Sequence, residues 1–174
     1  SSVARLELLR KTNSRILVAT PTYALHLAEV AKEQGYETST STIRCVLVAG
    51  EPGGSLEAVR QRISSVWGAD VLDHAGATEI GPWGVGWPEH SGLEVLEEWF
   101  HPEFLDISTG RPAKQGELAE LVLTTLGRYG CPVIRYRTGD VVHPVWPTEQ
   151  EVAAGRSPRV WLRGCLLYTS PSPR

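Results

Sequence analysis

The segment Gly76-Ala-Thr-Glu79 combines two side chains that suit phosphoryl chemistry. The hydroxyl of Thr78 can hydrogen-bond a phosphoryl oxygen, and the carboxylate of Glu79 can hold Mg²⁺ directly or through water. The segment follows a short apolar run of strand length. An exposed turn that happens to carry an acid explains the same residues, so the segment alone leaves both readings open.

A second acidic position closes the segment Arg135-Tyr-Arg-Thr-Gly-Asp140. The two oxygens of an Asp140 carboxylate are suitable acceptors for the two vicinal hydroxyls of a ribose. We expect a strand that ends in a turn here and presents the carboxylate. A polar β-turn without a ligand is the alternative, because Thr-Gly-Asp is common turn chemistry.

The third candidate is the glycine-rich segment Gly50-Glu-Pro-Gly-Gly54, between a predicted strand and a predicted helix. Glycines let a ligand approach the backbone closely, and the first turn of a helix offers free N–H groups. The segment matches neither GxGxxG nor the Gly-Lys-Ser/Thr phosphate loop. A tight strand–helix turn is the alternative.

Other reactive side chains lack a supporting pattern. The spacing of His74, His90 and His101 matches no known set of metal ligands. Cys131 has no neighbouring pattern of a nucleophile, and unreactive thiols are the norm. Among the tryptophans, Trp83 is the candidate for stacking on a ligand, because it comes just after the Thr-Glu segment.

The first half of the chain alternates apolar runs with helical segments. Helices are predicted over 3–10, 22–34 and 55–67, and strands over 16–19, 45–49 and 70–73. Thr20-Pro21 is expected to start the second helix, and Ser55 is the expected N-cap of the third. This alternation predicts a parallel sheet covered on both faces, with ligands beyond the carboxyl ends of the strands. Residues 49–54 and 74–79 then lie at a candidate site.

After about Gly81, the pattern of alternating helices and strands gives way to short strands. Strands are predicted over 93–97, 100–107, 118–125 and 133–136, separated by turn-rich pieces such as Ser108-Thr-Gly-Arg-Pro112. The expected fold class is therefore α/β: a parallel sheet flanked by helices, followed by an antiparallel, barrel-like β region. The expected boundaries are 1–85 for the α/β part, 86–164 for the β-rich part and 165–174 for a separate tail.

Composition excludes several classes of protein. The 174 residues are 41% hydrophobic and 21% charged, which is typical of one globular domain and excludes disordered and disulfide-rich chains. The net charge of −3, without a basic run, argues against nucleic acid as a partner. No apolar run is long enough to span a membrane. Three scattered cysteines fit a reducing cytoplasm.

The two ends of the sequence are unusual. Methionine is absent, so we expect Ser1 to be an internal residue of a longer protein. The last ten residues, from Cys165 to Arg174, resemble the translation of a transposase-type sequencing adapter. We leave them out of the functional reasoning as an expected assembly artefact; a natural flexible tail is the alternative.

In this order, the candidate segments resemble the adenylate-forming superfamily of acyl-CoA synthetases, and within it the phenylacetate–CoA ligase family. The resemblance covers about Ser14 to Gly164. The segments that carry it are Thr20-Pro-Thr-Tyr-Ala-Leu-His-Leu27, Val48-Ala-Gly-Glu-Pro-Gly-Gly54, Asp73-His-Ala-Gly-Ala-Thr-Glu-Ile-Gly-Pro82, Thr109-Gly110, Gly116-Glu-Leu118, Leu123-Thr-Thr-Leu126 and Ile134-Arg-Tyr-Arg-Thr-Gly-Asp140.

The resemblance implies a two-step reaction of the kind used in phenylacetate catabolism. A carboxylic acid first attacks the α-phosphorus of ATP, with Mg²⁺, to give an acyl-adenylate and pyrophosphate; the thiol of coenzyme A then displaces AMP. Positioning and charge neutralisation would do most of the work. An aryl acid such as phenylacetate is the expected substrate.

The resemblance also implies roles for individual residues. The adenine would be bordered by the backbone of Gly50, Glu51 and Pro52. The nucleotide and acyl sites would be lined by Asp73, His74, Ala75 and Gly76. Thr78 would contact the α-phosphate, Glu79 would help to hold Mg²⁺, and Asp140 would bind the ribose hydroxyls. The acyl pocket would be walled by Tyr23, Ala75, Gly76, Pro82 and Trp83.

The sequence also departs from the family. Ala75 stands where many members carry a tyrosine against the adenine, so contact there would be weaker or supplied by His74. The triphosphate loop is expected upstream of Ser1, and the domain with the catalytic lysine beyond Gly164, so the fragment itself is expected to be inactive. An adenylating enzyme with another acyl acceptor and a catalytically dead nucleotide-binding module are the rival readings. A homo-oligomer of the parent protein is left open.

Overall fold

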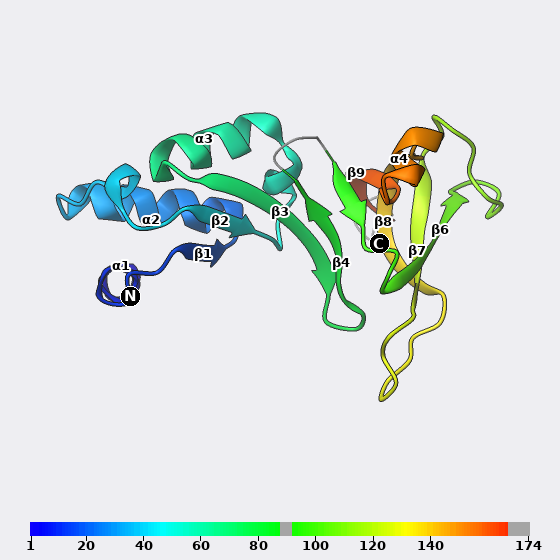
Figure 1. Ribbon diagram of the computed structural model, residues 1–174, viewed down its shortest axis with the longest axis horizontal. Helices are drawn as coiled ribbons and strands as arrows, with labels where there is room; N and C mark the ends of the chain where they lie inside the picture. The colour runs from blue at the N-terminus through cyan, green and yellow to red at the C-terminus, as the bar shows by residue number, and fades with distance from the viewer. Residues whose placement is uncertain (88–91, 167–174) are drawn as a thin grey trace, which may run out of the picture. The chain divides into compact units, whose positions relative to one another are not determined.

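The computed structural model describes residues 1–87 and 92–166 (Figure 1). The chain divides into two compact units. The α/β unit is Ser1–His74 with a short segment that begins at Gly86, and the β-rich unit is Ala75–Val85 and the chain from Gly92 onward. The predicted division lies after residue 85, whereas contacts assign the segment Ala75–Val85 to the β-rich unit.

The helices are α1 (Ser2–Lys11), α2 (Pro21–Glu33), α3 (Glu57–Trp67) and α4 (Glu149–Ala153), with 3₁₀ turns at Thr38–Thr40 and Pro52–Ser55. The strands are β1 (Ile16–Ala19), β2 (Cys45–Val48), β3 (Asp70–Ala77), β4 (Gly81–Gly86), β5 (Leu93–Val95), β6 (Phe100–Asp106), β7 (Ala119–Thr125), β8 (Tyr136–Val145) and β9 (Arg159–Cys165). Hydrogen bonds join them into an open sheet in the order β1-β2-β3-β4-β5-β9-β8-β7-β6.

The α/β unit confirms the parallel sheet predicted from the first half of the sequence. Strands β1, β2 and β3 pair in parallel, and each expected helix is present. The core contains Leu27, Val46 and Trp67, each at most 2% exposed. The expected cover on both faces is wrong for the described chain, because alternate residues Ile16 and Val18 of β1 are 59% and 68% exposed.

The starts of the two longer helices differ from each other. Thr20 is the N-cap of α2, as expected, and its side chain accepts a hydrogen bond from the backbone of Tyr23. The expectation that Ser55 caps α3 is wrong. The segment Pro52–Ser55 forms a 3₁₀ turn, because proline suits the first turn of a helix, and the N-cap of α3 is Leu56, without a side-chain bond.

Strand β3 is longer than the sequence indicates. The prediction ends it at Asp73, but the strand continues through Gly76 to Ala77. Small residues have low strand propensity, so this stretch looks like a loop in isolation. The small residues permit a close approach of the backbone at Gly81 and Pro82. A Cβ at Gly76 would lie 3.0 Å from both the Gly81 carbonyl oxygen and the Pro82 Cα.

The β-rich unit confirms an antiparallel arrangement, since β6, β7, β8 and β9 pair antiparallel in turn. Its core includes Trp83, Leu93, Leu121 and Leu123, each at most 1% exposed. The barrel-like expectation is corrected to an open sheet. Strands β4 and β9 and helix α4 were not predicted; in β4 the reason is its three glycines and one proline, which are poor strand formers.

Strand β8 overturns the expected turn at Thr138–Asp140. The strand begins at Tyr136 and runs on to Val145. On β7, Val122 pairs with Arg137 and Glu120 pairs with Val141, so β8 has two more residues than β7 between these pairs. The sequence Thr-Gly-Asp therefore forms a β-bulge inside the strand, which Gly139 allows because its φ is 76°.

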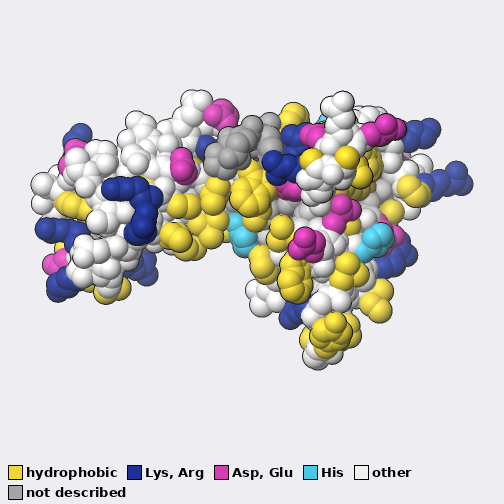
Figure 2. Space-filling model, in the orientation of Figure 1, with side chains coloured by type: hydrophobic (Ala, Val, Ile, Leu, Met, Phe, Trp, Pro, Cys, Tyr) yellow, Lys and Arg dark blue, Asp and Glu magenta, His cyan; other side chains and the backbone are white. Residues whose placement is uncertain are grey.

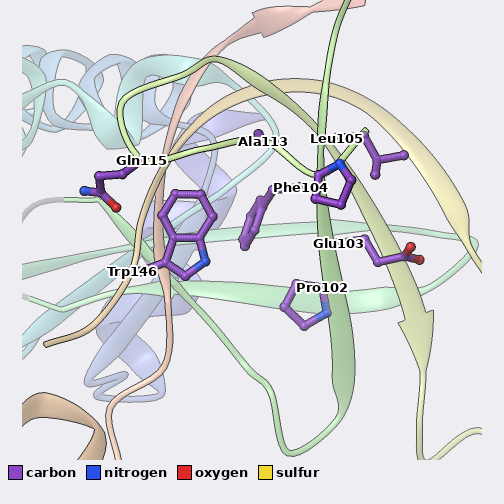
Figure 3. A pocket seen from close by; sticks show the side chains of 8 residues that line it. Pro102, Glu103, Phe104, Leu105, Ala113, Gln115 and Trp146 are labelled. Atoms are coloured by element: carbon purple, nitrogen blue, oxygen red, sulfur yellow. The ribbon is translucent and has the colours of Figure 1, made fainter. Parts of the chain in front are cut away.

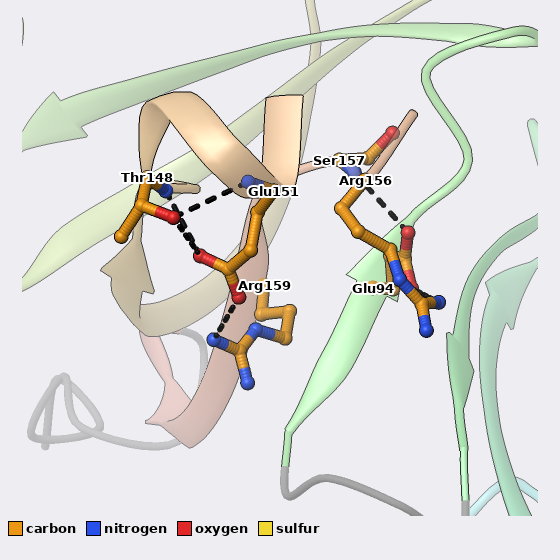
Figure 4. Close-up of polar contacts among 6 residues, drawn as sticks. All are labelled: Glu94, Thr148, Glu151, Arg156, Ser157 and Arg159. Atoms are coloured by element: carbon orange, nitrogen blue, oxygen red, sulfur yellow. Dashed lines mark hydrogen bonds and ion pairs between the residues drawn. The ribbon is translucent and has the colours of Figure 1, made fainter. Parts of the chain in front are cut away.

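Helix α4 and the segment after it are held by two carboxylates (Figure 4). Glu151 and Thr148 form a capping box at the start of α4, and Arg159 donates to Glu151 at 3.3 Å. Glu94 of β5 is 9% exposed and accepts from the Ser157 backbone N–H at 3.1 Å and from Arg156 at 3.4 Å.

We expect Glu94→Gln to lower the free energy of unfolding by about 1 to 2 kcal/mol, because a buried acceptor of two hydrogen bonds loses its charge. Urea unfolding of both proteins measures the difference. Glu98→Gln, at an exposed position nearby, is the matched control and should change stability by less than about 0.5 kcal/mol. Equal losses in the two variants would show that Glu94 has no special role.

The described chain contains no helix with the length and apolar character needed to cross a membrane. On the face that Figure 2 draws, basic and acidic side chains are interspersed. Cys45, Cys131 and Cys165 are all free thiols. The prediction for the last ten residues falls mostly outside the described residues; Cys165 is the last residue of β9.

Candidate functional site

The turn Thr78–Ile80 joins β3 to β4 and exposes the side chains of Thr78 and Glu79. The Ile80 N–H donates to the Ala77 carbonyl oxygen at 3.2 Å and closes the turn. The guanidinium of Arg128, from the loop between β7 and β8, donates to the Glu79 carbonyl oxygen. This contact ties the turn to a loop that lies 49 residues further along the chain.

Tyr136 is close to two acidic residues that the sequence analysis singled out, Glu79 and Asp140. Burial is the largest cause that raises the pKa of the Tyr136 hydroxyl, followed by the negative charge of Glu79, an acceptor contact with Glu79 and the charge of Asp140. Each carboxylate therefore lies near the same phenol. The fold brings together Glu79 and Asp140, which the sequence separates by sixty-one positions (140 − 79).

Asp140 lies in the bulge of β8. Its backbone N–H donates to the Thr138 hydroxyl oxygen at 3.0 Å, and that hydroxyl donates to the Leu121 carbonyl oxygen at 2.9 Å. Burial raises the pKa of the Asp140 carboxyl, and the Thr138 hydroxyl lowers it. The bulge is thus anchored to β7 next to the carboxylate that it presents.

In the α/β unit, the glycine-rich segment lies against the start of α2. The Thr22 N–H and hydroxyl donate to the Glu51 carboxylate at 3.2 Å and at 2.7 to 2.8 Å, and lower its pKa. Gly50 has a φ of 84°, a conformation that favours glycine. The side chain of Glu51 therefore binds Thr22 at the start of α2. The part of Glu51 that can contact a ligand is its backbone.

Asp73 is buried in a cradle of small residues. Its carboxylate is 6% exposed and accepts a hydrogen bond from the His74 N–H at 2.9 Å. An added Cβ would lie 2.2 Å from its Oδ1 at Gly54 and 3.0 Å from its Cβ at Gly86. Burial raises the pKa of Asp73 to about 6, against the lowering effects of the His74 N–H and the charge of Arg60.

This shift predicts a pH dependence of stability. The unfolded chain releases the proton near pH 4, whereas the folded chain keeps it up to about pH 6. Stability therefore falls as pH rises from 4 to 6 and stays lower above that range. We expect Asp73→Asn to remove this fall and to be roughly 2 kcal/mol more stable at pH 7.

Urea unfolding of both proteins between pH 4 and pH 8 provides the measurement. Asp70→Asn, at an exposed position of the same strand, is the control and should keep the wild-type profile. Parallel curves for wild type and Asp73→Asn would rule out a protonated Asp73 in the folded chain.

The other candidate residues are distributed over both units. In the α/β unit, the Tyr23 hydroxyl lies 3.1 Å from Ser2 Oγ, and the Arg5 guanidinium lies over its ring. In the β-rich unit, Ala75 and Gly76 belong to β3, Pro82 is exposed, and Trp83 is 1% exposed within the core. Their roles in nucleotide or acyl binding stay predictions.

The remaining reactive side chains form no further centre in the part of the chain that the structure describes. No group of three or more potential metal ligands occurs there. His74 is half-buried, His101 and Cys131 are exposed, and His90 lies outside the described residues.

A cavity of about 440 Å³ lies elsewhere in the β-rich unit (Figure 3). It is lined by Pro102, Phe104, Pro112 and Trp146, with the Phe104 and Trp146 rings edge to face. None of the predicted site residues lines it.

The sequence analysis missed Arg128 and Tyr136, which contact or face Glu79. Tyr136 belongs to the quoted Arg-Tyr-Arg-Thr-Gly-Asp segment, so its place in that motif was an available signal. Arg128 lies in a turn-rich loop without periodicity, and nothing local in the sequence links it to Glu79.

The donors in the β-rich unit are compatible with Mg²⁺. Glu79, Thr78 and Asp140 offer hard oxygen ligands, and Mg²⁺ is usually held by one or two carboxylates together with waters and substrate phosphates.

Comparison with known proteins gives related enzymes of one kind. The chain is 32% identical over 140 residues to the phenylacetate–coenzyme A ligase of Pseudomonas putida, covering 79% of this chain and 31% of that protein. It is 33% identical over 139 residues to the enzyme of the same name from Escherichia coli, covering 78% and 31%. The chain thus spans about a third of the length of these relatives. No family model matches it.

Solved structures of CoA ligases and related enzymes have the same fold as this chain. A 2-hydroxyisobutyryl-CoA ligase in complex with 2-HIB-AMP and CoA superposes with a TM-score of 0.83 at 29% identity, over 94% of this chain and 39% of that one. A luciferase-like enzyme from Zophobas morio shares the fold, with a TM-score of 0.63 at 16% identity, over 95% of this chain and 41% of that one.

The fold and the sequence together define the class of adenylate-forming CoA ligases. Within this class, the chain belongs to the phenylacetate–CoA ligase family.

Proposed function

We propose that this chain is the nucleotide-binding part of a longer AMP-forming carboxylate–CoA ligase that acts on phenylacetate or a related aryl acid. The observation that carries the proposal is that Tyr136 lies near both Glu79 and Asp140, the two motif acids expected at the metal and at the ribose. The similarity to phenylacetate–coenzyme A ligases and to a CoA ligase with a bound acyl-AMP supports it.

In the first step, a carboxylate oxygen of the acid attacks the α-phosphorus of ATP. The new P–O bond forms as the bond to pyrophosphate breaks, and pyrophosphate leaves with the electron pair. Thr78 donates its hydroxyl hydrogen to an α-phosphate oxygen, and Asp140 accepts from the two ribose hydroxyls. Mg²⁺, when bound, neutralises phosphate charge, and Glu79 is the carboxylate of this chain that would hold it.

In the second step, the sulfur of coenzyme A attacks the acyl carbon, and AMP leaves with the bonding electrons. The backbone of Gly50, Glu51 and Pro52 borders the adenine, while the segment from Asp73 to Gly76 lines the nucleotide and acyl sites. In the β-rich unit, the exposed Pro82 offers apolar surface to the acid, whereas Trp83 is buried in the core and offers none. We further propose that the ligase works in the cytoplasm, in phenylacetate catabolism.

Acid-dependent exchange of pyrophosphate into ATP, measured on the full-length protein with a panel of aryl and alkyl acids, tests the first step. Acyl transfer to coenzyme A or another thiol, which gives a thioester, or to hydroxylamine, which gives a hydroxamate, tests the second. We expect exchange with phenylacetate or a close relative, and a thioester only with coenzyme A. Absence of exchange with every acid would reject the function, and a preference for another acceptor would place the protein in a different adenylating branch.

A further inference from the structure

Strand β7 contains one charged residue in an otherwise apolar, buried stretch. Ala119, Leu121, Val122 and Leu123 are at most 1% exposed, and Glu120 is 4% exposed. Burial of a carboxylate costs several kcal/mol unless a partner compensates for the lost water. A buried Glu120 therefore has to be explained by what it contacts.

The partner of Glu120 is Arg137 of β8. The Arg137 Nε donates to both carboxylate oxygens, at 2.9 and 3.1 Å, and a second guanidinium nitrogen donates to Oε2. Glu120 raises the pKa of Arg137 through this hydrogen bond and its charge. Such a forked contact fixes the direction of the arginine as well as its distance.

This ion pair spans the bulge that carries Asp140. Glu120 pairs in register with Val141, just after the bulge, whereas Arg137 lies just before the bulge. The contact between Glu120 and Arg137 therefore joins the two ends of the bulge across the sheet. Between them, the Thr138 hydroxyl bonds to Leu121 and to the Asp140 N–H.

We propose that Glu120 is a positioning residue, which acts through Arg137 to fix the bulge at Thr138–Asp140 and so aims the Asp140 carboxylate at the nucleotide. This inference rests on the proposed function. Stability alone is a weak reason for such a pair, because the Arg137 side chain is 71% exposed and water weakens an ion pair that has an exposed partner. A rigid bulge would hold the Asp140 carboxylate in the orientation that it needs to accept hydrogen bonds from both ribose hydroxyls.

Three variants of the full-length protein separate positioning from stability. Glu120→Gln removes the charge, Arg137→Lys keeps a charge without the fork, and the double variant Glu120→Met with Arg137→Met replaces the pair by apolar side chains. Glu103→Gln is the matched control, because Glu103 forms a comparable ion pair with Arg135 at 3.0 Å outside the bulge.

In pyrophosphate exchange, we expect Glu120→Gln and the double variant to raise the KM for ATP about tenfold, with the KM for the acid unchanged. Arg137→Lys should show an intermediate rise, and Glu103→Gln should stay within twofold of wild type. Hydrogen exchange of the backbone amides at 136–142 should be faster in Glu120→Gln and in the double variant, while the double variant retains wild-type resistance to urea.

An unchanged KM for ATP in a folded variant would overturn the proposal. Failure of the double variant to fold would also overturn it, because the pair would then be needed for stability. If the wild type shows no acid-dependent pyrophosphate exchange, the proposed function fails. Amide hydrogen exchange at 136–142 then still tests whether Glu120 orders the bulge. An unchanged rate of amide hydrogen exchange in Glu120→Gln would reject the ordering role of Glu120 as well.

Discussion

Replacement of Glu79 by glutamine in the full-length protein is expected to lower the rate of acyl-adenylate formation by about 100- to 1000-fold. Glutamine keeps the size of the side chain and one carbonyl oxygen, but it removes the negative charge that would hold Mg²⁺ at the phosphates. The turn itself should persist, because Arg128 bonds to the backbone of residue 79 and not to its side chain.

Acid-dependent pyrophosphate exchange and circular dichroism, measured together, test this expectation. The control is Glu98→Gln, an exposed acidic residue of the same unit, which should retain full activity. A rise in the Mg²⁺ concentration needed for half-maximal exchange would connect the loss to the metal. Undiminished exchange by Glu79→Gln would remove this residue from the metal role.

Gly54→Ala is expected to destabilise the chain by about 3 kcal/mol. The new methyl group would lie 2.2 Å from Asp73 Oδ1 and 2.8 Å from Val48 Cγ2, and both side chains are buried. Neither can move away without displacing the core of the α/β unit. Because the carboxylate of Asp73 is the first group in the way, the substitution should also alter the pH dependence that Asp73 causes.

Urea unfolding of Gly54→Ala beside Gly130→Ala measures this effect. A Cβ at Gly130 would have no atom within 4 Å, so this control should change stability by less than about 0.5 kcal/mol. A similarly small change in Gly54→Ala would mean that the cradle around Asp73 is wider than the structure indicates.

The parts of the fold that local signals determine could be predicted from the sequence. Thr20-Pro21 marked the start of α2, and short apolar runs marked β1 and β2 at their observed positions. Strand β4 and the second half of β3 were missed, because glycine and alanine reveal a strand only when the neighbouring backbone is known to approach it closely. The close approach of the β4 backbone also explains why residue 76 is a glycine, because an added Cβ would lie 3.0 Å from the Gly81 carbonyl oxygen.

The candidate site was predictable as a set of motifs and not as a set of contacts. Thr78, Glu79 and Asp140 stood out by type and by motif. Arg128 did not, because its partner is a carbonyl oxygen, which any residue could provide. The Glu120–Arg137 pair was equally hidden, since the bulge that sets its register has no sequence signal beyond a glycine.

The two additional residues of the β8 bulge have a consequence for how this protein can vary. Side chains alternate between the two faces of a strand, and an even insertion leaves this alternation in phase. Arg137 and Val141 therefore project to the same face, as they would in an uninterrupted strand, and the residues after the bulge reach the core unchanged. Mutation can thus reshape the bulge without repacking the interior, so the groups that the bulge presents and the packing of the core can evolve separately.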